Sequence, residues 1–167
     1  MKKIALILMV IGIQMGFAQN IAYIESSIIL EKMPEFEQAT TELEEKVNTW
    51  ETELDNKFQS IESMYNEYVK TEALMSEDVR KQKQEAIFEA ERLANEFKES
   101  KFGQDGELFT LQEEKLKPSY DKINTASETV ATENGYDYVF DKSIESNWIF
   151  TNPKHDLTEK VITNLGL

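Results

Sequence analysis

The side chains that could carry out acid–base or nucleophilic chemistry are few in this chain. Its 167 residues contain a single histidine, His155, and no cysteine, so a catalytic site would need a serine triad or a pair of carboxylates. His155 lies between Pro153 and Asp156, in a segment typical of a loop, and Asp156 is placed to cap a following helix. Carboxylates are so numerous that their proximity means little. The sequence therefore predicts no enzymatic activity.

Two kinds of ligand site lack the residues that they need. Gly103 and Gly106 flank Gln104 and Asp105, but no strand is expected before them and no lysine follows as it does in a phosphate-binding loop. A metal site of the helical-bundle type needs Glu-x-x-His on a helix, and the sequence has none. We expect no cofactor and no bound metal.

Apolar residues are arranged symmetrically around the polar turn Ser76-Glu77-Asp78. Residues at equal distances on the two sides form pairs whose numbers sum to 155: Phe58 with Phe97, Ile61 with Ala94, Tyr65 with Ala90, Val69 with Ala86, Val47 with Leu108, and Ala39 with Leu116. This pattern is expected when two long helices run antiparallel and pack along one seam. The sequence predicts a long antiparallel helical hairpin over residues 35–120, with its tip at residues 76–78.

The first helix of this hairpin is expected over residues 35–75. Its seam advances in steps of three, four and four through Phe36, Ala39, Leu43, Val47, Trp50, Leu54, Phe58, Ile61, Tyr65 and Val69. This 11-residue repeat, with about 3.67 residues per turn, predicts a straight or slightly right-handed pair of helices. Trp50, Phe58 and Tyr65 are expected in the core.

Local signals define the second helix. Ser76 is a suitable N-cap, Gly103 and Gly106 should interrupt the helix and act as a hinge, and Pro118 should bend the part that follows.

Residues 19–34 and 121–167 are predicted to form a small body with β-strands. Strands are expected at 20–25, 136–141 and 148–151, a short helix capped by Ser26 or Ser27 follows the first, and a C-terminal helix covers 157–165. The expected fold class is thus mostly α with a small β body. A body of about 50 residues is marginally stable alone, and short strands leave open edges. We expect a homo-oligomer that joins strands across protomers through Ile21, Tyr23, Tyr138, Phe140 and Ile149.

The N-terminus has the pattern of a cleavable signal peptide over residues 1–18. Lys2 and Lys3 precede an apolar run from Ile4 to Phe17, and this run is shorter than the roughly 20 residues of a spanning helix, which is the alternative interpretation. We expect export to the periplasm without stable membrane insertion. Loss of the two lysines would change the formal charge from −14 to −16, which argues against nucleic acid or anionic lipid as a partner.

The chain is similar to the Skp/OmpH family of periplasmic chaperones over essentially its whole mature length. The similarity rests on the long charged hairpin and on these segments: Ile21-Ala22-Tyr23-Ile24, Ile28-Ile29-Leu30, Met33-Pro34-Glu35-Phe36, Gly135-Tyr136-Asp137-Tyr138-Val139-Phe140-Asp141, Ile149-Phe150, Asp156-Leu157-Thr158, Val161-Ile162 and Leu165. It implies an ATP-independent holdase for unfolded outer-membrane proteins, a homotrimer with a central barrel, and helical arms around a client cavity. The best-known relatives are basic, whereas this chain is acidic, so no lipopolysaccharide contact is carried over.

Apolar residues that fall off the predicted seam are the candidates for client binding. They are Met64, Tyr68, Met75 and Phe88, and flexible methionine and amphipathic tyrosine suit loose, promiscuous contact. The alternatives are ordinary exposed apolar residues or additional packing in the seam. For the whole chain, the alternative function is a structural or adaptor coiled-coil protein of the cell envelope without general chaperone activity.

Overall fold

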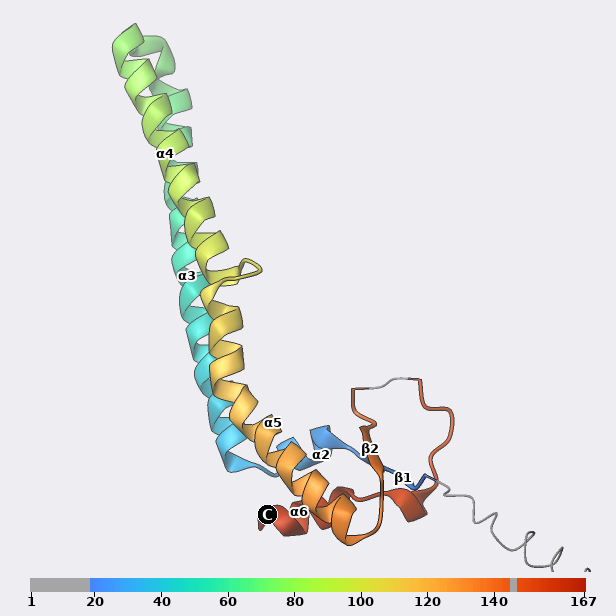
Figure 1. The fold of residues 1–167 in the computed structure, drawn as a ribbon. Helices are drawn as coiled ribbons and strands as arrows, with labels where there is room; N and C mark the ends of the chain where they lie inside the picture. Colours follow the sequence, from blue (N-terminus) through green and yellow to red (C-terminus); the bar gives the residue numbers. More distant parts are fainter. Residues whose placement is uncertain (1–18, 145–146) are drawn as a thin grey trace, which may run out of the picture. The chain divides into compact units, whose positions relative to one another are not determined.

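A computed structural model describes residues 19–144 and 147–167 (Figure 1). The predicted signal peptide, 1–18, lies outside the described residues. The chain divides into two compact units, one formed by residues 33–121 and one by residues up to 32 together with 122–167. The elements in chain order are β1 (Ile21–Ile24), α2 (Ser26–Leu30), α3 (Pro34–Thr71), a 3-10 turn η1 (Glu72–Leu74), α4 (Glu77–Phe102), α5 (Glu107–Glu133), β2 (Tyr138–Asp141), η2 (Pro153–His155) and α6 (Thr158–Leu165).

The unit of residues 33–121 is a long antiparallel hairpin, in which α3 runs alongside α4 and the first part of α5 (Figure 1). Helix α3 begins at Pro34, with Glu35 and Glu37 in its first turn. Proline suits this position because the backbone N–H that it lacks would have no partner within the helix. The two carboxylates are stabilised by the positive end of the helix dipole. The 38 residues of α3 extend about 57 Å at 1.5 Å per residue. The predicted fold class, mostly helical with a long hairpin, is confirmed.

The tip of the hairpin is defined by short-range hydrogen bonds. Helix α3 ends at Thr71, earlier than predicted, and the 3-10 turn leads to Ser76. The Ser76 hydroxyl accepts a hydrogen bond from the Val79 amide at 3.4 Å. The predicted N-cap is therefore confirmed.

The burial pattern of α3 corrects the predicted seam beyond Leu54. Side chains that are buried or half-buried from Trp50 onward recur in alternating steps of four and three: Trp50, Leu54, Lys57, Ile61, Met64, Tyr68, Thr71 and, past the end of the helix, Met75. This is a seven-residue repeat, so the 11-residue repeat is wrong in the outer half of the helix. A seven-residue repeat is typical of left-handed helix pairs.

Lysine at a seam position explains the error. The Lys57 amine lies 5.0 Å from the centre of the Phe97 ring, so the long aliphatic stem covers the seam while the charge meets an aromatic face. Phe58, the next residue, is turned outward and 42% exposed, and Tyr65 is 57% exposed, whereas Trp50 is only 5% exposed. Trp50 is core as predicted, and the prediction for Phe58 and Tyr65 is wrong.

The second unit is built on two parallel strands. Residues Ile21, Ala22, Tyr23 and Ile24 of β1 are in register with Tyr138, Val139, Phe140 and Asp141 of β2. On its other edge β1 bridges to Asp156, and the Leu157 amide donates to the Tyr23 carbonyl at 2.9 Å. The core of this unit comes from β1, α2, α5 and α6, and its most buried large residues are Ile29, Ile123, Leu157 and Val161.

The predicted third strand at residues 148–151 is wrong for the single chain. These residues have no strand structure, and the only sheet among the described residues contains β1 and β2. A strand needs a neighbour for its backbone groups, and the described chain offers none here. Trp148 instead packs its ring edge against Phe140, with ring centres 5.8 Å apart, while Ile149 and Phe150 are exposed.

Within the described residues, no helix combines the length and apolar character that a bilayer crossing requires.

Candidate functional site

Three of the four predicted client-binding residues lie inside the hairpin. Tyr68 is 6% exposed and belongs to a core cluster with Ile61, Ile87 and Ala94, and Met64 and Met75 pack against that cluster. The shift of the seam to a seven-residue repeat moves all three from the surface to the interface. The prediction that they are off the seam is therefore wrong, and Phe88, which is 68% exposed, is the one that stays on the surface.

Tyr68 joins the two helices through its hydroxyl group. The hydroxyl donates to the Glu72 carboxylate at 2.8 Å and accepts a hydrogen bond from the Gln84 amide at 2.7 Å. The hydrogen bond to Glu72 is the main reason that the pKa of Tyr68 is raised, because it favours the protonated phenol. A buried aromatic ring with a satisfied hydroxyl specifies one register of the hairpin.

The exposed apolar residues on one side of the hairpin form a surface that the sequence did not reveal. Phe58, Tyr65 and Val69 each directly follow a seam position of α3, and Phe88 directly follows the seam residue Ile87 of α4; all four are exposed. Residues that follow seam positions on two antiparallel helices lie on the same side of the pair, because the opposite chain directions reverse the sense of rotation. We call this side of the hairpin, which carries these four residues, the aromatic flank.

The other side of the hairpin has a different composition. We call this side the opposite flank. It carries the residues that directly precede seam positions, among them the exposed Leu74 and Leu93. Its carboxylates are paired with basic residues of the chain: Glu67 accepts from Lys83 at 2.9 Å and Glu53 lies 3.4 Å from Lys57. The hydrogen bond from Lys83 holds the pKa of Glu67 below its usual value.

Acidic residues on the aromatic flank lack such partners. Asp55 and Glu62 directly follow the seam residues Leu54 and Ile61, and no ion pair or side-chain hydrogen bond joins either of them to another residue in the ranges that the structure describes. The seven-residue seam would have revealed this flank in the sequence, because the acids and the aromatic residues fall on one side only when the seam is placed correctly.

The predicted glycine interruption is present as a closed turn between α4 and α5. Gly103 caps α4 and donates to the Glu99 carbonyl at 2.9 Å, and the Gly106 amide donates to the Gly103 carbonyl at 2.9 Å. A Cβ atom on Gly106 would lie 2.8 Å from the Lys101 carbonyl oxygen and 2.9 Å from the Gly103 nitrogen, which is too close for any side chain. The closed turn therefore has no room for a side chain at Gly103 or Gly106. Flexing of the chain at these two glycines stays a prediction.

Lys101 anchors this turn to α3. Its amine lies 5.0 Å from the centre of the Trp50 ring and forms an ion pair with Glu107, just after the turn. Trp50 in turn packs edge-on against Phe102, with ring centres 6.0 Å apart. The turn therefore sits beside the most buried aromatic residue of the hairpin.

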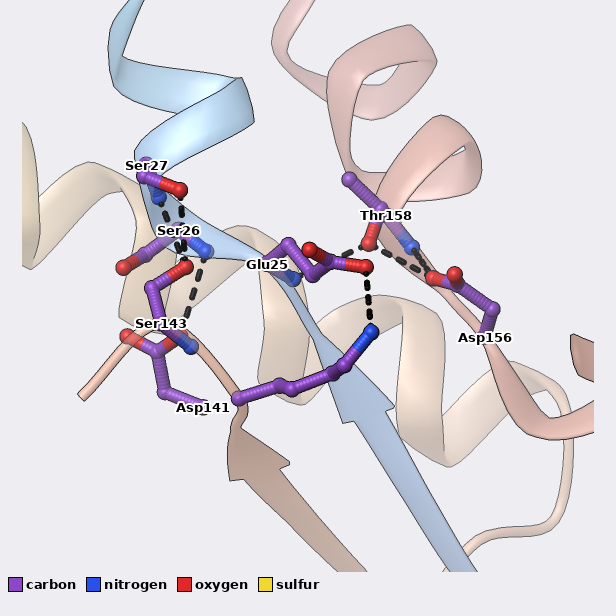
Figure 2. Close-up of polar contacts among 8 residues, drawn as sticks. Glu25, Ser26, Ser27, Asp141, Ser143, Asp156 and Thr158 are labelled. Atoms are coloured by element: carbon purple, nitrogen blue, oxygen red, sulfur yellow. Dashed lines mark hydrogen bonds and ion pairs between the residues drawn. The ribbon is translucent and has the colours of Figure 1, made fainter. Parts of the chain in front are cut away.

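A polar cluster holds the ends of the strands together in the second unit (Figure 2). Asp141, at the end of β2, accepts hydrogen bonds from the backbone amides of Ser26 at 3.1 Å and Ser143 at 3.0 Å. Asp141 thus serves the start of α2, where no side-chain hydrogen bond from the N-cap residue, Glu25, is present. The predicted cap by Ser26 or Ser27 is wrong, because a residue 115 positions away performs it.

On the other side of this cluster, Thr158 accepts from the Glu25 amide at 3.0 Å and donates to Asp156 at 2.6 Å (Figure 2). The Glu25 carboxylate lies 3.0 Å from the Lys142 amine and raises the pKa of that lysine. A raised lysine pKa favours the charged form and opposes general-base chemistry. The cluster therefore acts as a structural clamp.

The residues predicted to join protomers differ in exposure. Ile21, Tyr138, Phe140 and Ile149 are exposed in the second unit, whereas Tyr23 is buried. Among the described strands β2 pairs with β1 alone, so its second edge is open. An open edge beside exposed apolar side chains is the kind of surface that strand pairing between chains uses.

The only histidine is packed in this unit and has a structural contact. His155 lies in η2, and its Nδ1 atom is 3.2 Å from the Tyr136 hydroxyl, with the two rings edge to face. Among the described residues, no group of three or more histidine, cysteine or acidic side chains is arranged to hold a metal ion.

Comparisons with known proteins agree with this architecture. The family model described as outer membrane protein (OmpH-like) matches residues 20–165. A solved structure of a candidate OmpH-like outer membrane chaperone from Caulobacter crescentus CB15 superposes with a TM-score of 0.67 at 13% identity, covering 89% of this chain and 84% of that one. The curated sequences contain no match to the chain. Because the family model spans nearly all the described residues, the chain belongs to the OmpH-like family of outer membrane proteins.

Proposed function

We propose that this protein is an ATP-independent holdase that binds unfolded outer-membrane proteins in the periplasm and keeps them from aggregating. The observation that carries the proposal is a two-helix arm about 57 Å long on which large apolar residues stay exposed, among them Phe58, Tyr65, Val69 and Phe88. Monomeric soluble proteins rarely leave such residues grouped along one element without a binding role. Membership of the OmpH-like family and the chaperone description of its structural neighbour support the same function.

The test is the aggregation of a denatured outer-membrane barrel protein. On dilution from urea, its light scattering should fall with increasing amounts of the mature chain, reach a minimum at a defined stoichiometry, and be unaffected by ATP. Several unrelated barrel proteins should be held equally well. An adaptor coiled-coil protein would instead bind one folded partner and leave the scattering of denatured clients unchanged, and that result would reject the holdase function.

We also propose that the second unit assembles protomers, with a trimer as the expected number. The open edge of β2 and the exposed side chains of Ile21, Tyr138, Phe140 and Ile149 support this assignment. Light scattering coupled to size-exclusion chromatography measures the mass directly. A protomer mass at micromolar concentration would contradict the assembly.

Export through a cleaved segment at 1–18 is part of the same proposal. The mass of the protein purified from the periplasm of an expressing bacterium should correspond to a chain that begins at Gln19. An intact N-terminus in the cytoplasmic fraction would contradict it.

A further inference from the structure

We propose that the aromatic flank of the hairpin binds unfolded polypeptide segments in which apolar residues alternate with lysine or arginine. The inference rests on the proposed holdase function and deepens it, because it names the chemistry of the segments that the arm holds. The surface consists of Phe58, Tyr65, Val69 and Phe88, together with the acids interspersed among them.

The positions on α3 that directly follow the seam carry only two kinds of side chain. From Trp50 to the end of the helical segment they are acidic or apolar, in the order Glu51, Asp55, Phe58, Glu62, Tyr65, Val69 and Glu72. The positions that directly precede the seam carry mainly small or polar side chains, such as Asn56, Ser60 and Ser63. The two sides of one helix therefore offer different chemistry to a partner.

The charges on the two sides also differ in whether they are already neutralised. Glu53 and Glu67 form ion pairs with Lys57 and Lys83 on the opposite flank. Asp55 and Glu62, between the exposed aromatics, form no ion pair with any residue of the described ranges. On the α4 side of the aromatic flank, Lys98 and Glu91 offset one another. The aromatic flank thus keeps a net negative charge that a basic partner would neutralise.

Exposed aromatic rings add a second way to recognise a cation. Within the hairpin itself, the amines of Lys57 and Lys101 lie 5.0 Å from the ring centres of Phe97 and Trp50, a distance at which the ring quadrupole attracts the charge. Phe58, Tyr65 and Phe88 present rings of the same kind to solvent. A lysine or arginine side chain can therefore contact a ring and a neighbouring carboxylate together.

Charge decides between this partner and the other occupants of an apolar surface. A second copy of the arm would carry the same unpaired acids, and an anionic membrane would be repelled as well. A basic, apolar, extended segment gains both from contact with the exposed rings and from attraction to the unpaired acids.

The experiment uses the mature chain and three labelled unstructured peptides of equal length and equal apolar content, whose remaining residues are lysine, serine or glutamate. Fluorescence anisotropy should give a dissociation constant about tenfold lower for the lysine peptide than for the glutamate peptide, a difference of about 1.4 kcal/mol. The preference should decrease as sodium chloride is raised, because exposed charges are screened. Equal affinity for the three peptides, or tight binding to vesicles of phosphatidylglycerol, overturns the inference.

Two variants and one control place the binding surface. Asp55→Asn with Glu62→Gln, which leaves every packed contact in place, should reduce the preference for the lysine peptide several-fold. Phe58→Ser with Tyr65→Ser should weaken the binding of all three peptides, and circular dichroism checks that the variant keeps its helicity. The control, Leu74→Ser with Leu93→Ser, removes exposed apolar groups from the opposite flank and should change neither result. An equal loss in the control overturns the assignment to the aromatic flank.

The peptides are too short to aggregate, so this result is independent of the holdase test. If peptide selectivity is absent while denatured barrel proteins are still held, the inference fails and the proposed function stands. If selectivity is present but aggregation continues, the proposed function fails and the binding surface stands.

Discussion

At the scale of single residues, the arm is defined by which side of each helix a side chain occupies, and one position decides this. Of the pairs predicted around the tip, Ile61 with Ala94 is confirmed, since both are in the core cluster, whereas Tyr65 and Val69 of the neighbouring pairs are exposed. The sequence prediction failed at Lys57, because a charged residue is not expected in a seam and the adjacent Phe58 is apolar. The aliphatic stem of lysine, stabilised by the Phe97 ring, satisfies the seam without being apolar in type.

Truncation of two aromatic residues tests this seam. Phe58→Ala should lower the free energy of unfolding by less than about 1 kcal/mol, because its side chain is largely solvated, as is typical of surface positions. Trp50→Ala should lower it by about 3–5 kcal/mol through the cavity that it leaves. Urea denaturation followed by circular dichroism gives both values. Similar large losses for the two variants would restore the 11-residue seam.

A second prediction at this scale concerns pH and the ion pairs between helices. The pKa of Glu42 is held below its usual value by the hydrogen bond from Lys115, and that of Glu67 by the hydrogen bond from Lys83. A lowered folded-state pKa stabilises the fold above the unfolded pKa of about 4.5, and this contribution disappears as the pH falls through the folded value.

Lys83→Met with Lys115→Met should therefore lower the melting temperature at pH 7, and the difference from the unaltered protein should shrink at about pH 3. The effect will be small, because exposed pairs contribute little. Lys70→Met, which removes a lysine with no ion pair among the described residues, is the control for net charge. A difference that stays constant with pH would contradict the assignment.

At the scale of elements, features that depend on neighbouring residues could be predicted from the sequence, and features that depend on distant residues could not. Ser76 and the two glycines act on their own neighbours, so the tip and the interruption could be predicted from the sequence. The cap of α2 could not, because Asp141 reaches it from the far end of the chain. Residues 148–151 have strand-forming composition, but strand formation depends on a partner that composition does not reveal.

The turn between α4 and α5 gives a prediction for an element. Gly106→Ala would force the new methyl group against the Lys101 and Gly103 backbone, so the turn must open, and the free energy of unfolding should fall by about 1–3 kcal/mol. Gln104→Ala, at an exposed position of the same turn, should be nearly neutral. Hydrogen exchange of the amides around the turn measures the opening locally. Unchanged protection in the Gly106 variant would show that the turn is not closed in solution.

At the scale of the whole molecule, the two units expose different surfaces. The hairpin exposes apolar and acidic residues along its length, whereas the unit with β1 and β2 exposes apolar residues beside an open strand edge. The proposed client holding and the proposed assembly should therefore respond to different substitutions.

Charge at the strand edge tests this separation. Tyr138→Asp with Phe140→Asp should reduce the assembled mass to that of the protomer at micromolar concentration, since like charges would meet where strands join. Leu74→Asp, at an exposed position of the arm, is the control and should keep the mass of the unaltered protein. An unchanged mass for the double variant would assign assembly to another surface.

The pairing of β1 with β2 has a consequence for how the protein matures. These strands lie at opposite ends of the chain, and Asn20 at the start of β1 bonds to Asp137, 117 residues later. Joining such distant segments costs loop-closure entropy and slows folding. Hairpin formation brings Phe36 against Tyr120, with ring centres 6.2 Å apart, and so shortens the effective loop. We therefore expect the arm to form first and the sheet to close last, so that a chain that is still folding already exposes its aromatic flank.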